Sequence, residues 1–249
     1  MNNIIALGAF LVLSFRTDPA ALVAMGDEAF FSVDYPSAVS AYESALEANA
    51  GNPEILWRLA RVYVCMGEVA GESLRRPLFE RAESYARQCI QSDSSKAEGH
   101  TWFAGALGYL ALEAGMRQQV VLTRELNTEV EKALALNPDD DAALSIKGSM
   151  YRALGNVGWL QRQLAAILFG GVPKGGFEEA EAALKKAISL APDIMRHHYE
   201  LAILYLDWDR KAEAKKVLEH AVRLPVRVAI DRERLVKIKQ LLTRFKDSQ

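Results

Sequence analysis

The chain has 249 residues, enough to bury a sizeable core as one large domain or two small ones. Half of the residues are apolar and a quarter are charged, as is usual for a soluble globular protein. The formal net charge of -2 lacks the basic excess of a nucleic-acid-binding protein, so nucleic acid is not an expected partner.

The N-terminal segment, residues 1–17, is apolar, and its role stays open. Ile4 to Phe15 has no polar residue except Ser14 and is too short for a comfortable membrane span. Its length suits the core of a signal peptide, but no Lys or Arg precedes it and no clean Ala-x-Ala cleavage site follows. The alternatives are a secretory signal or weak membrane anchor, and a first helix that packs on the rest of the chain. A signal peptide would make the protein secreted or periplasmic.

Residues 18–249 carry a repeated helical pattern. A small residue, a large apolar residue four positions later and a small residue three positions after that recur five times. These spacings place all three positions on one helix face, where small side chains let a neighbouring helix approach closely. The copies are Ala38/Tyr42/Ala45, Ala82/Ala86/Cys89, Leu126/Val130/Ala133, Ala180/Leu184/Ala187 and Ala214/Leu218/Ala221. Ala86 and Leu126 depart from the pattern in size.

A second pattern precedes each copy of the first. It is clearest in Leu59-Ala60-x-x-Tyr63 and Leu201-Ala202-x-x-Tyr205, and weaker in Met25-Gly26-x-x-Ala29, Ala106-x-x-Tyr109 and Gly148-x-x-Tyr151. A proline follows each of the last three copies of the first pattern (Pro138, Pro192 and Pro225), where a residue without an N–H ends a helix. Together the patterns resemble the tetratricopeptide consensus. The sequence therefore predicts an all-α tetratricopeptide-repeat-like solenoid of five helix pairs.

The spacing of the repeats predicts insertions. Successive second helices start 44, 44, 54 and 34 residues apart, against a family period of 34. The extra residues fall at the turn inside each repeat, and these turns share one edge of a solenoid. We expect a loop over Gly67 to Pro77 in the second unit and longer helices in the third.

The insertion in the fourth unit predicts an extra helix over Trp159 to Phe169, ended by Gly170-Gly171 and Pro173. This helix is apolar on most sides, so something must cover it. It could plug the concave groove of the solenoid, pack along its edge or meet a partner. We favour packing on the solenoid itself, because exposed apolar patches of this size are rare in monomers.

The concave face of the solenoid is the candidate binding surface. Outward positions of the first helices include Phe30, Phe31, Leu110 and Ile203, and the site candidates are Trp57, Arg61, Phe103, Leu107, Arg152, Trp159, Arg162, Arg196 and Tyr199. An apolar groove with a few arginines suits an amphipathic peptide or an acyl chain with an anionic head group. The alternative is that the inserted helix fills the groove and these residues are core.

The C-terminal stretch from Ile230 to Phe245 predicts a capping helix. An apolar stripe of Leu235, Ile238, Leu241, Leu242 and Phe245 lies opposite a basic side of Arg232, Arg234, Lys237, Lys239 and Arg244. A polar outer face is what the end of a solenoid requires. The sharper interpretation is a docking patch for an acidic protein or an anionic lipid.

No motif in the sequence indicates catalysis. His197 and His198 are adjacent and point to different helix faces, so they cannot form a metal-binding pair. Nothing matches a phosphate loop, a nucleotide fingerprint or a nucleophile elbow. Cys65 and Cys89 lie within apolar helical patterns and are expected to be buried. We therefore expect a binding protein without metal or other cofactor.

Several segments resemble a family narrower than the repeat class. They are Trp57-Arg58-Leu59-Ala60-Arg61, Glu131 to Pro138, the inserted helix from Trp159, Phe177-Glu178-Glu179-Ala180 and Gln240 to Phe245. Together they resemble the regulator of microtubule dynamics family, over about Trp57 to Phe245. The resemblance implies a microtubule (tubulin) partner and a cytoplasmic, cytoskeleton-associated place. For one membrane-anchored branch it implies phospholipid binding and transfer, so a phospholipid is the alternative ligand.

Overall fold

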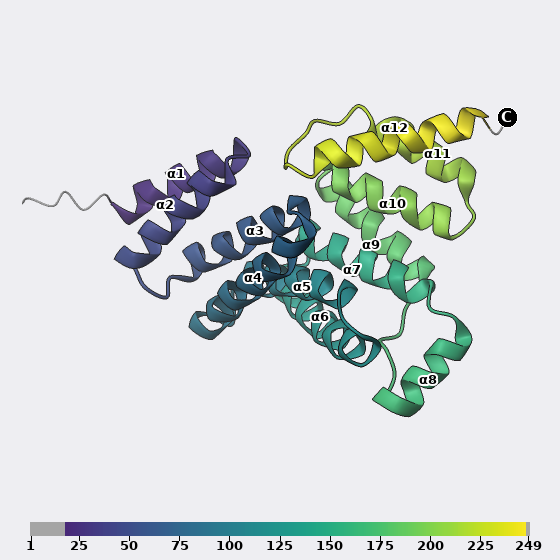
Figure 1. The fold of residues 1–249 in the computed structure, drawn as a ribbon, viewed down its shortest axis with the longest axis horizontal. Helices are drawn as coiled ribbons and strands as arrows, with labels where there is room; N and C mark the ends of the chain where they lie inside the picture. The colour runs from purple at the N-terminus through teal and green to yellow at the C-terminus, as the bar shows by residue number, and fades with distance from the viewer. Residues whose placement is uncertain (1–17, 248–249) are drawn as a thin grey trace, which may run out of the picture.

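The computed structural model describes residues 18–247, so the N-terminal segment lies outside it. The described part of the chain forms twelve helices and no strand. The first helices of the five pairs are α1 (Pro19–Phe31), α3 (Pro53–Val69), α5 (Ala97–Leu112), α7 (Asp141–Gly155) and α10 (Met195–Asp207). The second helices are α2 (Tyr35–Ala48), α4 (Glu72–Ser92), α6 (Met116–Leu136), α9 (Phe177–Leu190) and α11 (Lys211–Ala221). Figure 1 shows the pairs stacked side by side in chain order, which confirms the predicted solenoid.

Local sequence signals fix where the helices begin. The side chains of Asp18, Asp34, Asn52 and Asp140 each accept a hydrogen bond from a backbone N–H in the first turn of the following helix. Such caps satisfy N–H groups that have no partner inside the helix. Pro19 and Pro53 follow their caps at the first helical position, where the missing N–H costs nothing.

The repeated small residues let the paired helices pack closely. All positions of the first pattern are buried, as predicted. A β-carbon added to Gly26 would lie 2.4 Å from the Tyr42 ring, and one added to Gly148 would lie 2.5 Å from Cγ of Leu184. Each of these glycines therefore makes room for the large residue at the centre of the partner helix.

The predicted loop over Gly67 to Pro77 is wrong. Helix α3 runs to Val69 and α4 begins at Glu72, so the added residues lengthen both helices. Pro77 lies in the second turn of α4, where it removes a single helical hydrogen bond. Packing nearby offsets this loss, because the Phe79 ring stacks on Tyr109 with centroids 4.4 Å apart. In the third unit the predicted lengthening of both helices is confirmed: α5 has 16 residues and α6 has 21, against 13 and 11 in the fifth pair.

The inserted helix α8 (Trp159–Phe169) has the predicted bounds, but it neither fills the groove nor packs closely on the solenoid. It stands away from the stacked pairs in Figure 1, and most of its apolar side chains are exposed. Its Arg162 donates to the backbone oxygen of Val157 at 3.2 Å and to that of Leu154, beside the end of α7. The preference for self-packing is thus wrong, because α8 is held mainly by polar contacts near its two ends: those of Arg162, and one from Arg124 of α6 to the backbone oxygen of Gly171 at 2.9 Å.

The C-terminal helix α12 (Asp231–Asp247) packs its apolar stripe on α10 and α11, as predicted for a cap. Arg234, however, is buried and does not lie on the exposed basic side. Its guanidinium donates to Glu68 of α3 and to Asp231, each at 2.9 Å. The N–H of Ala229 donates to the hydroxyl of Tyr35 in α2 at 3.0 Å. These bonds join the last helix to the first two pairs, and we call them the closing contact.

Candidate functional site

An apolar pocket of about 400 Å³ lies among α5, α6, α7 and α10, with α8 at its rim. Its wall is mostly aliphatic and includes Val120, Leu126, Ile146, Met150, Leu154 and Val172. Gln161 and Ala165 of α8 and Met116 of α6 also border it. The inserted helix therefore leaves the groove open here and forms one side of it. A pocket of this size and lining is typical of sites for small apolar ligands.

Charged side chains border the same pocket at α7 and α10. Arg152 forms ion pairs with Asp207 at 2.9 Å and with Glu200 at 3.3 Å. Arg196 makes no hydrogen bond or ion pair within residues 18–247. Burial alone would lower the pKa of Arg196, but the nearby Tyr109 and Glu68 raise it above the ordinary value. Arg196 is thus a fixed positive charge beside an apolar cavity, without a direct partner in the described chain.

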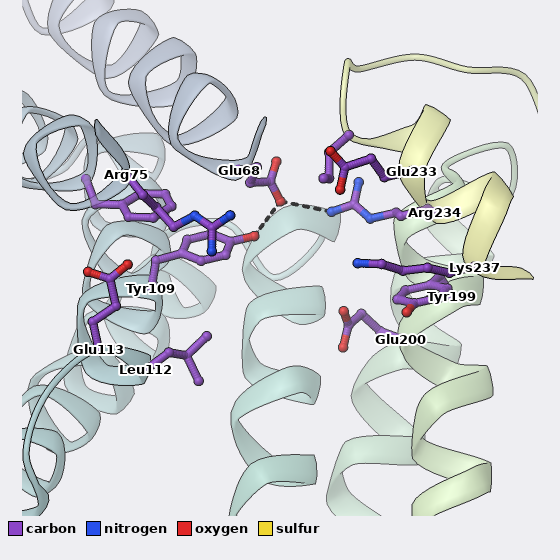
Figure 2. Close-up of a pocket in the computed structure, with 12 residues that line it drawn as sticks. Glu68, Arg75, Tyr109, Leu112, Glu113, Tyr199, Glu200, Glu233, Arg234 and Lys237 are labelled. Carbon is purple, nitrogen blue, oxygen red and sulfur yellow. Dashed lines mark hydrogen bonds and ion pairs between the residues drawn. The ribbon is translucent and has the colours of Figure 1, made fainter. Parts of the chain in front are cut away.

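A second, polar pocket of about 400 Å³ adjoins the first at Tyr109, Leu112 and Glu200. Figure 2 shows Glu68 accepting hydrogen bonds from Tyr109 and from Arg234 of the closing contact. Tyr199, a predicted site residue, lines this pocket and is half-buried. The polar pocket carries both signs of charge, so it has no evident preference for an anion or a cation.

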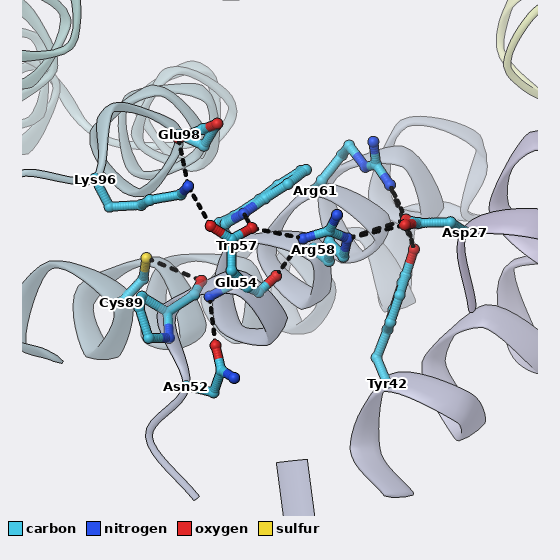
Figure 3. A network of polar contacts seen from close by, with 11 residues as sticks. Asp27, Tyr42, Asn52, Glu54, Trp57, Arg58, Arg61, Cys89, Lys96 and Glu98 are labelled. Carbon is cyan, nitrogen blue, oxygen red and sulfur yellow. Dashed lines mark hydrogen bonds and ion pairs between the residues drawn. The ribbon is translucent and has the colours of Figure 1, made fainter. Parts of the chain in front are cut away.

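Trp57 and Arg61 lie elsewhere, in a polar network between α1, α2 and α3 (Figure 3). Asp27 accepts hydrogen bonds from Arg58 at 3.1 Å, Arg61 at 3.3 Å and the Tyr42 hydroxyl at 2.6 Å. The Arg61 guanidinium also covers the Trp57 ring, 5.0 Å from its centroid. These contacts join the first two pairs and occupy most of the polar atoms of the network, although the buried Nε of Arg61 has no hydrogen-bond partner among the described residues. Trp57 and Arg61 therefore serve mainly to hold these helices together.

The carboxylate of Glu54 lies in the same network. Burial alone would raise the pKa of Glu54, but hydrogen bonds from Lys96, Trp57 and Arg58 lower it to about 2. Glu54 is therefore ionised under all ordinary conditions, and it links α3 to Lys96 in the segment before α5.

Three of the other predicted site residues are placed differently from the expectation. Phe103 and Leu107 are buried core residues of α5, because the outward face of that helix is covered by its neighbours. Arg162 donates to the backbone oxygens of Val157 and Leu154 and so holds α8 to the end of α7. Trp159 opens α8, but its side chain lies outside the described residues. Of the predicted set, the structure brings together only Arg152 and Arg196 at the apolar pocket, with Tyr199 next to them.

The last part of the chain has a strongly basic surface. The segment of residues 210–247, which we call the basic hairpin, contains α11, α12 and their connection. It carries twelve Lys or Arg and five Asp or Glu, so its formal charge is +7 in a chain of -2. Seven of its cations make no ion pair within the described residues: Lys215, Lys216, Arg223, Arg232, Lys237, Lys239 and Lys246. All of these except the half-buried Lys215 are exposed.

Sequence reasoning missed Glu68 and the buried position of Arg234. The two side chains are 166 residues apart in the chain, and helical periodicity describes only neighbours within one helix. The one available signal was a carboxylate near the end of the apolar helix α3, since such a residue needs a buried partner. The buried cysteines are confirmed: both are free, and burial raises the pKa of Cys65 to about 12.

Comparison with known proteins shows which family of repeat proteins the chain belongs to. The sequence pattern of the family "Regulator of microtubule dynamics protein 1-3" matches residues 22–246. The chain belongs to this family. The resemblance inferred from the tryptophan-containing insertion and the flanking segments is therefore confirmed.

Relatives in the regulator of microtubule dynamics family cover most of the chain. Regulator of microtubule dynamics protein 3 of Xenopus laevis is 30% identical over 191 residues, which are 76% of this chain and 41% of that protein. Protein 1 of Bos taurus is 27% identical over 78% of this chain and 62% of its own length. The chain thus spans less than two thirds of these vertebrate relatives. Protein 1 of Caenorhabditis elegans, 24% identical over 88% of this chain, is covered over 97% of its length.

The fold of this family member has a solved counterpart. The crystal structure of a thermophilic TPR protein from Thermus thermophilus superimposes with a TM-score of 0.67. It covers 91% of this chain and 100% of the other at 22% sequence identity. This similarity confirms the tetratricopeptide fold, and at such low identity it concerns the fold alone.

Proposed function

We propose that this chain is a non-catalytic binding protein that attaches to microtubules through its basic hairpin. The concentration of exposed, unpaired cations over residues 210–247, in a chain otherwise rich in carboxylates, carries this proposal. Cations that have no internal partner are available to bind a strongly acidic protein surface. The attraction between oppositely charged surfaces also steers the two proteins together over a long range. The names of the relatives, regulators of microtubule dynamics, support the choice of partner. The proposal places the chain in the cytoplasm, on the cytoskeleton.

Co-sedimentation of the full chain with stabilised microtubules tests this proposal. We expect binding that weakens as salt is raised, because exposed charges are screened. Lys216→Glu with Lys239→Glu should weaken binding roughly tenfold or more, equivalent to about 1.4 kcal/mol. The matched control is Arg117→Glu with Lys174→Glu, which makes the same change in net charge at positions outside the hairpin. Equal loss in both variants, or no pelleting of the wild-type chain, would rule the hairpin out.

The apolar pocket favours a second candidate function, the binding of an apolar ligand with an anionic group, such as a phospholipid. The supporting observation is Arg196, a cation without a direct partner beside an aliphatic cavity of about 400 Å³. Such a cation would pair with the anionic group of the ligand, while the aliphatic wall of the pocket would contact its acyl chain.

Native mass spectrometry of the purified chain, followed by solvent extraction, tests the second candidate. We expect one lipid per chain in the wild type and a loss of most of it in Arg196→Gln. Lys186→Gln serves as the control, since Lys186 lies on the outer side of α9 and does not line the pocket. A ligand-free mass for the wild-type chain would leave protein binding as the only function proposed.

A further inference from the structure

Helix α8 exposes a continuous apolar stripe. Leu160, Leu164, Ile167 and Leu168 are 62%, 42%, 77% and 61% exposed. Steps of four, three and one place them on one face of the helix. Among the described side chains of α8 only Ala165 is buried. Scattered single apolar residues on a surface need no explanation, but four in register on a protruding helix indicate that something covers them.

The two segments that carry and border this stripe contain cations and no acidic residue. Residues 156–176, which include α8, and residues 114–124, at the start of α6, together have four cations (Arg117, Arg124, Arg162 and Lys174) and no Asp or Glu. The whole chain has 32 acidic residues in 249, so a stretch of this combined length would ordinarily hold about four. The absence is therefore a property of these two segments, and the carboxylate of Asp207 reaches them only at Asn156, at 2.8 Å.

The two segments form one surface. Arg124 of α6 donates to the backbone oxygen of Gly171 at 2.9 Å, which ties the end of the insertion to α6. At the start of α6, Met116 and Val121 are also exposed apolar residues. Arg162 fixes the other end of α8 to the end of α7, so the stripe is held outward. In Figure 1, α8 lies at the lower edge of the molecule and α12 at its upper edge.

We propose that α8 and the first turns of α6 dock on the surface of a lipid bilayer. An amphipathic helix with a cationic border lies in the interface with its apolar face among the acyl chains and its cations near lipid phosphates. A second copy of this chain fits less well, since a symmetric pair would bring the cations of both copies together without a carboxylate to neutralise them. No helix of residues 18–247 is long and apolar enough to cross a membrane, so α8 lies on the bilayer.

Docking in this way has a consequence for the apolar pocket. Met116 of α6 and Gln161 and Ala165 of α8 border both the pocket and the docking surface. The mouth of the pocket would then face the bilayer. The docking itself goes beyond the proposed microtubule and ligand functions, and it requires neither of them.

Local fluorescence quenching tests the docking at one residue. The variant Ile167→Cys in the full chain is labelled with an environment-sensitive fluorophore, because Cys65 and Cys89 are buried and react poorly. Vesicles of phosphatidylcholine with one third phosphatidylglycerol and brominated acyl chains are then added. We expect strong quenching at position 167. The control label at Leu74→Cys sits at an exposed apolar position of α4, 62% exposed like Leu160, and should not be quenched.

A second pair of variants measures attachment. Leu160→Glu with Ile167→Glu should reduce flotation with the same vesicles about tenfold or more, whereas Leu74→Glu should leave it unchanged. Circular dichroism melting checks that each variant is folded. Flotation without quenching at position 167 would overturn the proposal, because the chain would then attach elsewhere, for example by residues 1–17. So would absence of flotation, or self-association of the wild type that Ile167→Glu abolishes.

The quenching at position 167 does not depend on the proposed microtubule or ligand binding. Lys216→Glu with Lys239→Glu should leave quenching at position 167 unchanged, and Arg196→Gln should do the same. A failure of microtubule or ligand binding therefore cannot be mistaken for a failure of docking.

Discussion

Two glycines of the first helices differ in what an added methyl group would meet. At Gly148 the new β-carbon would lie 2.5 Å from Cγ of Leu184, whereas at Gly105 its nearest neighbour would be Cδ1 of Ile146 at 3.5 Å. Gly148→Ala should therefore destabilise the protein by about 1–2 kcal/mol, since overpacking outweighs the gain in helix propensity. Gly105→Ala should stabilise it by about 0.5–1 kcal/mol. Urea denaturation measures both, and equal effects would contradict the close packing at Gly148.

A buried ion pair between α5 and α6 should make stability depend on pH. The His100 ring lies 2.5 Å from the carboxylate of Glu129, which Lys132 also contacts at 2.8 Å. The hydrogen bond to Glu129 raises the pKa of His100, against the opposing effect of burial. Burial would raise the pKa of Glu129, but hydrogen bonds from His100 and Lys132 lower it.

The sign of each shift gives the direction of the pH dependence. The raised pKa of His100 contributes stability that is complete below its unfolded value of about 6.5 and is lost as pH rises through the folded value. The urea midpoint should therefore fall as the pH rises above about 6.5. His100→Gln should cost about 3 kcal/mol at pH 6 and flatten this slope. An unchanged slope in the variant would show that another group titrates.

At the scale of the helices, the closing contact depends on a buried charge pair. Arg234→Met would leave the carboxylates of Glu68 and Asp231 buried without their cation, which should cost about 3–5 kcal/mol. The control is Arg227→Met in the segment before α12. The partner of Arg227, Asp193, has an exposed side chain, so this change should cost less than about 1 kcal/mol. In a double-mutant cycle, Glu68→Gln should restore part of the loss. Additive effects of the two changes would contradict a direct interaction.

The positions of the helices could be predicted from the sequence, but which neighbouring elements cover each helix could be predicted only in part. The repeat pattern placed all five pairs, and Gly170-Gly171 marked the end of α8, because both signals are local. Whether α8 would be covered depends on the distance between its turn and the groove, which no local pattern encodes. The loop expected before Pro77 failed for the same reason: packing of Phe79 on Tyr109 keeps that segment helical.

For the candidate site, the sequence identified Arg152, Arg196 and Tyr199 as groove residues but could not separate them from Phe103 and Leu107. All five lie on first helices, and only the curvature of the stacked pairs decides which positions the neighbouring helices bury. Arg61 pairs instead with Asp27 from another repeat, and the indole N–H of Trp57 donates to Glu54 of the same helix.

At the scale of the whole molecule, the closing contact couples the two ends of the solenoid. In an open repeat array, loss of the last element affects only its neighbour. Removing residues 222–249 should here also loosen the part of α3 around Glu68, although Arg234 follows it by 166 residues. Amide hydrogen exchange should become at least tenfold faster, a change of roughly 1.4 kcal/mol in local opening, both in α10 and α11 and near Cys65 to Val69. Acceleration confined to α10 and α11 would contradict the coupling.

The closing contact also limits how this protein can change in length during evolution. An open solenoid tolerates the gain or loss of a whole repeat, because each unit contacts only the next one. Here an additional helix pair would carry Arg234 past Glu68 and Ala229 past Tyr35, leaving both ends of the contact without partners. The geometry of the closing contact therefore sets the number of pairs. Residues added inside a repeat, as in the long helices α4 and α6 or in the insertion that forms α8, leave the contact in place.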